Sequence, residues 1–401
     1  MKFDNKRKIG ALFLIVLAVI TAFLPMALHL FFPALPSVKS EFEVAEATVN
    51  LTVSIPLFVM AFTSLIYGAL SDHFGRRPIL LGAIFLFIVG STISAIAGNI
   101  WILILGRVIQ AAGAGGSLGL ARTIARDVFG ADRLVKAMSY LTIAYTLGPM
   151  ISTPIGGALV DMYNWRAVPV VAALFGIIMG FVCILVMFET HTKRKKNPQT
   201  YNPFFDFLAL FKKIRFTSYV LQSGFSTAIF FTMATASSFL MIEYLERPAS
   251  EYGLLFICFP AGFLVGSLIS NRLSGVVSIE VMVLMGSFVM ATGAVTQSAF
   301  LLLGIVTPLS IFLPGFIAIS GQGIALPNAQ AGAINVVGSL AGTAAGIGAF
   351  CQLFAAALST QIFGLFADGT PFPMAIVVTA ISVAVVIVGY IPFSLRKRDP
   401  D

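Results

Sequence analysis

Twelve long apolar stretches constrain this chain more than any other feature of its sequence. They cover 9–34, 50–70, 78–98, 101–121, 138–160, 167–188, 217–241, 253–271, 281–301, 304–326, 338–364 and 372–393. A helix needs about 20 apolar residues to cross a hydrocarbon core that is about 30 Å thick. Charged residues make up only 10% of the chain, against about 25% in a soluble domain. We therefore predict an all-α membrane protein with twelve transmembrane helices.

The basic residues predict the orientation of these helices. Of the 25 Lys and Arg residues, 21 fall on the side of the two termini, and Lys39, Arg166 and Arg247 fall on the other side. Cytoplasmic loops of membrane proteins are enriched in Lys and Arg. We expect both termini to be cytoplasmic, and we interpret the net charge of +8 as topology rather than as a nucleic-acid site.

The longest connection predicts two halves. It separates an N-terminal six-helix half (1–190) from a C-terminal six-helix half (217–401), with a cytoplasmic linker at 191–216. An amphipathic segment at 204–214 is expected to lie on the membrane surface. Two sets of six helices are typical of transporters built from repeats. The uncharged first stretch is too long for a signal peptide, so we expect an uncleaved span.

The connection between the second and third stretches is a short charged turn. It contains Gly68, Asp72, Gly75, Arg76 and Arg77. Gly75 permits a left-handed backbone, and the Asp72 carboxylate can accept hydrogen bonds from helix amides or from an arginine.

The fourth stretch places Arg107 and Gln110 inside the membrane, followed by a run of small residues. An arginine within a span is costly and faces either a cavity or a protein partner. Arg107 is therefore either an anchor between helices or a site residue.

The fifth stretch contains Gly148, Pro149, Pro154, Gly156 and Gly157. Prolines bend a membrane helix, and glycines let another helix approach closely. The pattern predicts a bent helix with tight packing.

These three motifs together resemble the major facilitator superfamily. Three further runs are similar to its Bcr/CflA branch of bacterial drug exporters: 33–36 (PALP), 122–127 (RTIARD) and 242–254. The resemblance implies an exporter of small molecules in the bacterial inner membrane, driven by proton antiport. It also implies that Asp72, Arg76 and Arg77 latch the two halves together, that Arg107 acts in substrate or proton coupling, and that the fifth-stretch motif marks exporting antiporters.

One position departs from that family. His29 stands four residues before the Pro33–Pro36 run, where relatives usually have an aspartate, and all 17 acidic residues fall in predicted loops or at the ends of predicted spans. Burial disfavours a charged imidazole. We expect His29 to be neutral at rest and to become charged when an anionic group lies beside it, or else to be a polar histidine with no transport role.

The predicted cavity is therefore neutral to positive. Neutral, zwitterionic or anionic amphipathic molecules suit such a cavity better than cations do. Gln110, Tyr145 and Gln222 are further candidates for substrate or proton coupling, with interhelical hydrogen bonding as the alternative.

Other functions fit the sequence less well. The fold also accommodates an importer or facilitator of a small metabolite. An enzyme would need clustered His, Asp or Glu, but the three histidines, His29, His73 and His191, are scattered. A channel would need a filter-like motif. We expect no cofactor, no metal and no nucleic-acid partner, and we expect a monomer in the lipid bilayer with a small-molecule substrate.

Overall fold

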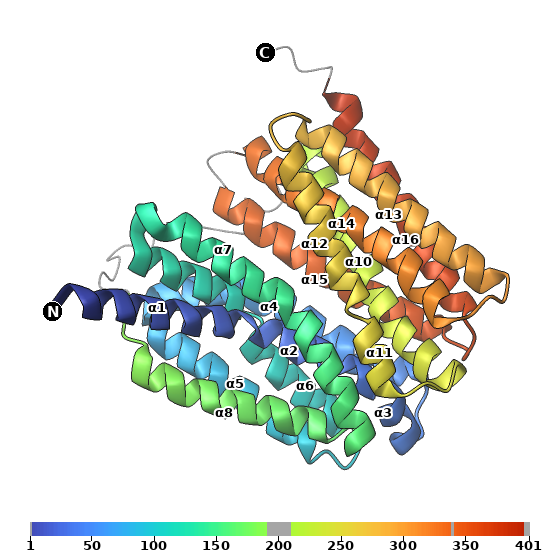
Figure 1. Cartoon of the computed structure of the whole chain (residues 1–401), viewed down its shortest axis with the longest axis horizontal. Coiled ribbons are helices and arrows are strands. Elements are labelled where there is room, and N and C mark those ends of the chain that lie inside the picture. Colours follow the sequence, from blue (N-terminus) through green and yellow to red (C-terminus); the bar gives the residue numbers. More distant parts are fainter. Residues whose placement is uncertain (1, 191–209, 338–340, 397–401) are drawn as a thin grey trace.

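The computed structural model describes residues 2–190, 210–337 and 341–396, which form helices and their connections (Figure 1). Twelve segments are long and apolar enough to span a membrane, so the predicted number of spans is confirmed. They are numbered here as spans one to twelve in chain order.

The first six spans come from eight α-helices and one 3₁₀ helix. These are α1 (Lys2–Thr21), α2 (Phe23–His29), η1 (Phe32–Ala34), α3 (Leu35–Phe42), α4 (Glu46–Phe74), α5 (Arg76–Ala95), α6 (Ile100–Ala114), α7 (Ser117–Met162) and α8 (Ala167–Val186). Span one runs from α1 through α3, and α7 supplies the end of span four as well as all of span five.

The last six spans have a similar layout. Their elements are α10 (Ile214–Phe239), the π-helix η2 (Leu240–Tyr244), α11 (Ala249–Leu255), α12 (Cys258–Leu273), α13 (Ile279–Leu302), α14 (Pro308–Val337), α15 (Ala341–Phe366) and α16 (Phe372–Leu395). Span seven joins α10 to η2, and span eight joins α11 to α12.

Span one differs from its predicted bounds. We expected it to end at Ala34, but it continues to Phe42. The run from Pro33 to Pro36 lies inside the span because each proline occupies the first turn of a short helix, η1 or α3, where its missing N–H costs nothing. Span four likewise continues to Phe129 rather than ending near residue 121.

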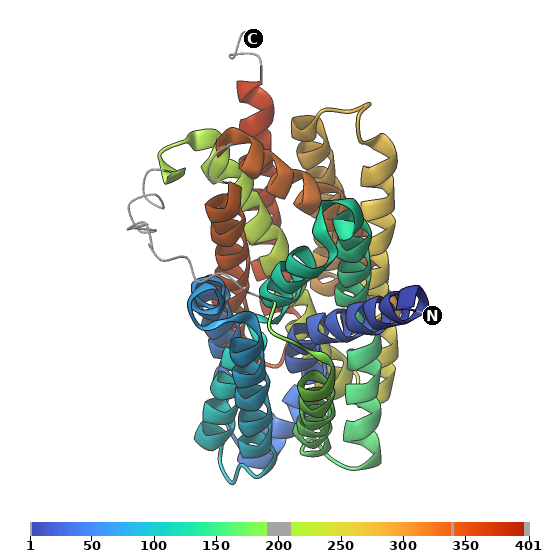
Figure 2. The ribbon, with the colours of Figure 1, turned by 90° about the vertical axis from the view of Figure 1, so that its left-hand side faces the viewer.

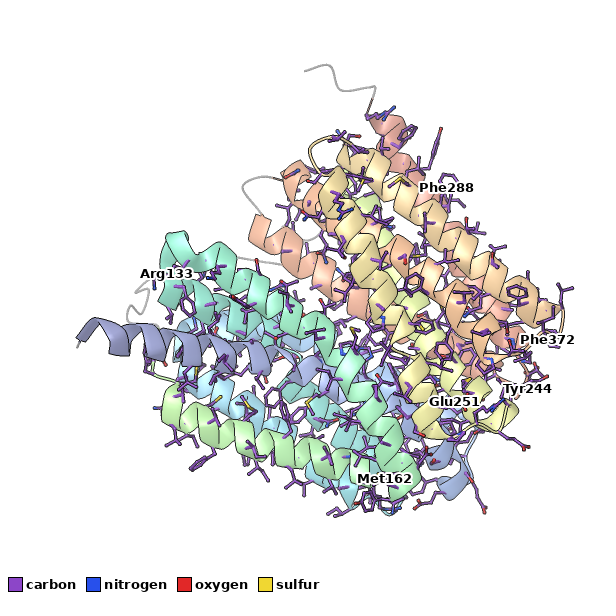
Figure 3. All side chains as sticks on the ribbon, in the orientation of Figure 1. Arg133, Met162, Tyr244, Glu251, Phe288 and Phe372 are labelled. Carbon is purple, nitrogen blue, oxygen red and sulfur yellow. The ribbon has the colours of Figure 1, made fainter. Side chains whose placement is uncertain are left out.

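The two halves meet along one end of the bundle. Because the spans alternate in direction, both termini lie at one end, here called the termini end, and the opposite end is called the far end. The ribbons of the halves are closest around α3 and α11 and diverge towards the termini end (Figure 1). Figure 2 shows the same ribbon from the side on which the N-terminus lies. Met162, Glu251 and Tyr244 lie at the far end, whereas Arg133 lies at the termini end (Figure 3).

The predicted linker falls largely outside the described residues, and so does most of the amphipathic segment at 204–214. Leu210, within its described part, is buried in a cluster with Phe216 and Tyr219 of α10. The boundaries 1–190, 191–216 and 217–401 remain predictions.

Candidate functional site

His29 lies in an aromatic cage where the two halves meet. It is the last residue of α2 and is 4% exposed. Its ring contacts Phe32 of the same span and Phe230, Phe231 and Phe256 of the C-terminal half, with ring centroids 5.2 to 5.8 Å apart. Nδ1 is buried with no hydrogen-bond partner among the described residues. The cage therefore places a buried imidazole nitrogen without a hydrogen-bond partner against an apolar wall.

Arg107 lies in a different place, among the helices of the N-terminal half. Its guanidinium donates to the carbonyl oxygen of Thr52 at 3.2 Å, to that of Ala27 at 2.5 Å and to Gln110 Oε1 at 2.5 Å. Gln110 Nε2 in turn donates to Ser91 Oγ at 2.8 Å. These bonds connect spans one, two, three and four, so Arg107 makes the contacts of an anchor between helices.

One guanidinium nitrogen of Arg107 has no hydrogen-bond partner among the described residues. The guanidinium lies over the ring of Phe31, with 4.4 Å between Cζ and the ring centroid, and Nη2 is buried without a partner among the described residues. Interactions with carbonyl dipoles and an aromatic face replace the ion pair that a buried guanidinium usually needs. Its positive charge therefore stays uncompensated by any carboxylate in these contacts.

The structure does not bring His29 and Arg107 together. Ala27 and Phe31 face Arg107, whereas His29, two residues after Ala27, contacts phenylalanines of the other half. Residues two apart on a helix point in nearly opposite directions. The two residues therefore make separate sets of contacts, and their part in substrate or proton coupling stays a prediction.

The other two predicted site residues, Tyr145 and Gln222, lie on helices α7 and α10. Tyr145 is half-buried in α7, and none of the contacts described here brings it to the cage. Gln222 is fully buried in α10, and its Nε2 donates to Ser287 Oγ of α13 at 3.3 Å, within the C-terminal half. Among the described residues, no ring contact joins Tyr145 to His29, and the part of both residues in coupling stays a prediction.

Carboxylates are confined to the ends of the spans. In the described part of the chain, each aspartate or glutamate lies outside the spans or within two residues of the end of one. The aromatic cage and the Arg107 network are both free of acidic side chains. An internal carboxylate that could neutralise a bound cation is absent from these two places.

The turn between spans two and three is held within the N-terminal half. Arg76 forms ion pairs with Asp72 at 2.6 Å and with Asp127 at 3.1 Å. Glu189, which follows span six, accepts hydrogen bonds from the backbone amides of Arg76 and Arg77 and lies against Gly75, whose φ is +99°. Glu189 thus caps the first turn of α5, a role that the sequence analysis missed.

The predicted latch makes no contact with the C-terminal half among these interactions. The Asp72 side chain is 64% exposed, and Gly68 has open space around its Cα. Because the halves diverge at this end (Figure 1), Asp72, Arg76 and Arg77 hold their own half together here. Their part as a latch between the halves stays a prediction.

The glycines of span five lie at close helix contacts. A Cβ at Gly148 would come within 2.6 Å of Pro25, and one at Gly156 within 2.1 Å of the carbonyl oxygen of Leu30, both in span one. At Gly157 it would come within 2.3 Å of the carbonyl oxygen of Ala249, in the other half. Pro149 and Pro154 lie inside the same continuous helix, α7.

Polar contacts close the far end between the halves. Asp161 accepts hydrogen bonds from the amides of Ala249 and Ser250 at 3.0 and 2.8 Å, so a carboxylate of span five caps the first turn of α11. Lys39 of α3 pairs with Glu243 of η2 at 2.5 Å. Ser54 donates to Gln361 Oε1 at 2.8 Å. Sequence reasoning missed these residues because no motif marks contacts between distant spans.

The sequence is similar to those of named drug-resistance proteins. It is 27% identical over 282 residues to the Bicyclomycin resistance protein homolog of Haemophilus influenzae, which covers 69% of this chain and 70% of that protein. It is also 27% identical over 261 residues to Multidrug resistance protein D of Escherichia coli, covering 64% of this chain and 65% of that protein. Both relatives are consistent with the Bcr/CflA branch.

The fold is shared with solved transporters. A bacterial homolog of the human lysosomal transporter Spinster, described as inward-facing and unoccupied, matches with a TM-score of 0.75 at 17% identity over 96% of both chains. The peptide transporter POT matches with a TM-score of 0.78 at 15% identity over 98% of this chain and 94% of that chain. The family model of the Major Facilitator Superfamily matches residues 17–360. The predicted fold, the transporter class and the exclusion of an enzyme are thereby confirmed, and the chain belongs to the Major Facilitator Superfamily.

Proposed function

We propose that the protein exports small neutral, zwitterionic or anionic amphipathic molecules by alternating access. The observation that supports this most directly is the His29 cage. An acid-free wall of phenylalanines with one buried, unpartnered imidazole nitrogen lies where the two halves meet. The printed names of the relatives, bicyclomycin resistance and multidrug resistance, support export as the direction.

The cage favours certain chemical groups. Phe230, Phe231 and Phe256 offer apolar surface to a ring or an alkyl chain, and the imidazole of His29 can donate to or accept from a polar group. A lipophilic cation would find aromatic faces but no carboxylate to balance its charge. Transferring it into a dry site would then be costly, so we expect selectivity against cations.

Alternating access is supported by the asymmetry between the two ends. The far end is closed by contacts between the halves at Asp161, Lys39 and Gln361. The opposite ends of the same spans diverge (Figure 1). With both termini in the cytoplasm, as the basic residues predict, this arrangement would correspond to a state in which substrate enters from the cytoplasm.

Proton antiport is the energy source that we propose. His29 is a titratable side chain at the junction of the halves, inside the aromatic cage. For antiport, substrate and proton would occupy the cage in turn: a substrate group that bonds to the neutral imidazole displaces the proton, and the imidazole takes up a proton again after the substrate has left. This coupling predicts a transport rate that depends on the pH gradient.

The test is transport by purified protein in proteoliposomes under an imposed pH gradient. Three probes cover the chemical classes: bicyclomycin as the neutral compound, an anionic naphthalene sulfonate dye, and tetraphenylphosphonium as the cation. We expect gradient-driven movement of the first two and little movement of the third. Saturable, proton-competed transport of tetraphenylphosphonium would contradict the proposal.

Import on the same fold is the alternative, because the geometry of the junction serves either direction. The same vesicles separate the two. Substrate accumulation against an inward proton gradient supports antiport, whereas uptake in the direction of the proton gradient supports an importer.

A further inference from the structure

The far end contains a group of charged side chains that the proposed function does not use. Lys39 of α3 lies 2.5 Å from Glu243 of η2 and 3.7 Å from Glu46, the first residue of α4. Lys39 and Glu46 belong to the N-terminal half, and Glu243 belongs to the C-terminal half. One ammonium group is thus shared by two carboxylates, one from each half.

The two carboxylates differ in their exposure. The Glu243 side chain is 33% exposed, whereas that of Glu46 is 6% exposed. A depression on the far face is lined by Lys39, Glu41, Glu43 and Glu243. Behind it, a cavity of about 20 Å³ is lined by Glu46 and Glu243 with Leu240, Tyr244, Phe363 and Thr370, among others. This volume has room for about one water molecule, so Glu46 has a confined position behind the Lys39–Glu243 pair.

The charges around Glu46 do not balance. The charged groups that act on it are Lys39, Glu243 and Asp368, which follows α15. Thr370 donates to the Asp368 carboxylate through its hydroxyl and its amide, which holds the pKa of Asp368 below its usual value and keeps this group ionised. With Glu46 ionised, one cation faces three carboxylates. Protonation of Glu46 removes the least hydrated of these negative charges.

We propose that Lys39, Glu46 and Glu243 form a proton-dependent lock that holds the far end closed while Glu46 is protonated. When Glu46 loses its proton, Lys39 exchanges Glu243 for Glu46, a partner within its own half. The bond between the halves is then lost, and opening of the far end hydrates the Glu46 carboxylate. This inference rests on the proposed alternating access.

The sign of the pH dependence follows from this exchange. The closed state binds one more proton than the open state, so acidification of the far side favours closure. One linked proton changes the ratio of closed to open states by up to about tenfold per pH unit. For an exporter, acid outside the cell would return the empty protein to the state that loads substrate from the cytoplasm.

The experiment measures the opening of the far end directly. Spin labels are placed at Tyr163 and Leu303, which are 69% and 74% exposed on connections of different halves. The full chain, with Cys183, Cys258 and Cys351 replaced by serine, is reconstituted in lipid nanodiscs. Distances are measured by double electron–electron resonance between pH 5.5 and 8.5. We expect the longer distance to gain population as the pH rises, by about tenfold over this range.

Variants separate the lock from a general effect of pH. Glu46→Gln imitates the protonated carboxyl and should keep the short distance at every pH. Glu243→Gln leaves Lys39 to pair with Glu46 and should show the long distance at every pH. Glu43→Gln removes the same charge from an exposed position of the same connection and should keep the response of the parent protein.

Three results would overturn the lock: a pH response that survives in Glu46→Gln, an equal loss of response in Glu43→Gln, or no longer distance in Glu243→Gln. Monodisperse elution from a size-exclusion column checks that each variant is folded. Lys39→Arg keeps the cation and should therefore retain the pH response. Transport in the vesicles described above is scored separately. A pH-dependent opening without transport of any probe would refute the proposed function and leave the lock standing.

Discussion

His29 and Arg107 lie on opposite sides of span one. Phe31 and the carbonyl of Ala27 face the Arg107 guanidinium, and the imidazole of His29 packs on Phe231 of the other half. A substrate in the aromatic cage would therefore meet His29 without meeting Arg107. The two residues should give different phenotypes when they are replaced.

Replacement of His29 should change selectivity rather than stability. His29→Ala removes one hydrogen-bonding group, which contributes about 0.5–1.5 kcal/mol, so we expect the apparent affinity for a neutral probe to fall by about 2- to 12-fold. His29→Asp should admit tetraphenylphosphonium because it supplies a counter-charge. Transport kinetics in proteoliposomes measure both effects. If His29→Ala transports with an unchanged pH profile, His29 is not the proton site.

Replacement of Arg107 should lower stability. Arg107→Met removes three hydrogen bonds and leaves Gln110 and two carbonyl oxygens with fewer partners. Two of these bonds reach other helices, and interhelical hydrogen bonds in membranes average about 0.6 kcal/mol each, so we expect a loss of at least about 1 kcal/mol, seen as a lower midpoint of thermal unfolding in detergent. Gln222→Met, which removes a single long hydrogen bond, is the matched control and should lose less.

Replacement of Asp161 should open the far end. Asp161→Ala removes the cap that span five places on α11. Loss of a helix cap costs about 1 kcal/mol, which corresponds to about a fivefold change in the ratio of closed to open states. Accessibility of a cysteine at a far-end position to a membrane-impermeant reagent reports this ratio. Asp161→Asn keeps an oxygen acceptor and should stay near the parent protein; a larger effect than that of alanine would contradict the capping role.

Gly157 should be sensitive to substitution because it lies at a close contact between the two halves. A methyl group there meets the carbonyl oxygen of Ala249 in the other half, and protein interiors accommodate such overlaps poorly. Gly157→Ala should therefore also favour opening of the far end. Gly119→Ala, whose added methyl meets nothing within 4 Å, should leave the cysteine accessibility unchanged. Equal reactivity of the two variants would show that the contact at Gly157 does not limit closure.

The number and approximate position of the spans could be predicted because the bilayer demands long apolar helices in which the backbone is hydrogen-bonded internally. The end of span one could not, because Pro33 and Pro36 signalled a stop and yet occupy first helical turns. The different contacts of His29 and Arg107 could have been predicted, because Ala27 and His29 are two residues apart on one helix and so face nearly opposite directions. The contact of Asp161 with Ala249 could not, because it depends on how the two halves lie against each other.

The lack of carboxylates within the spans has an electrical consequence. Arg107 is tied to helices of its own half, and among the described residues each aspartate or glutamate lies outside the spans or near the end of one. Moving one charge across the membrane potential involves about 2.3 kcal/mol per 100 mV. Rocking of the halves should displace little protein charge through the field, so the voltage dependence of transport should reflect the charge on the substrate and on any accompanying proton.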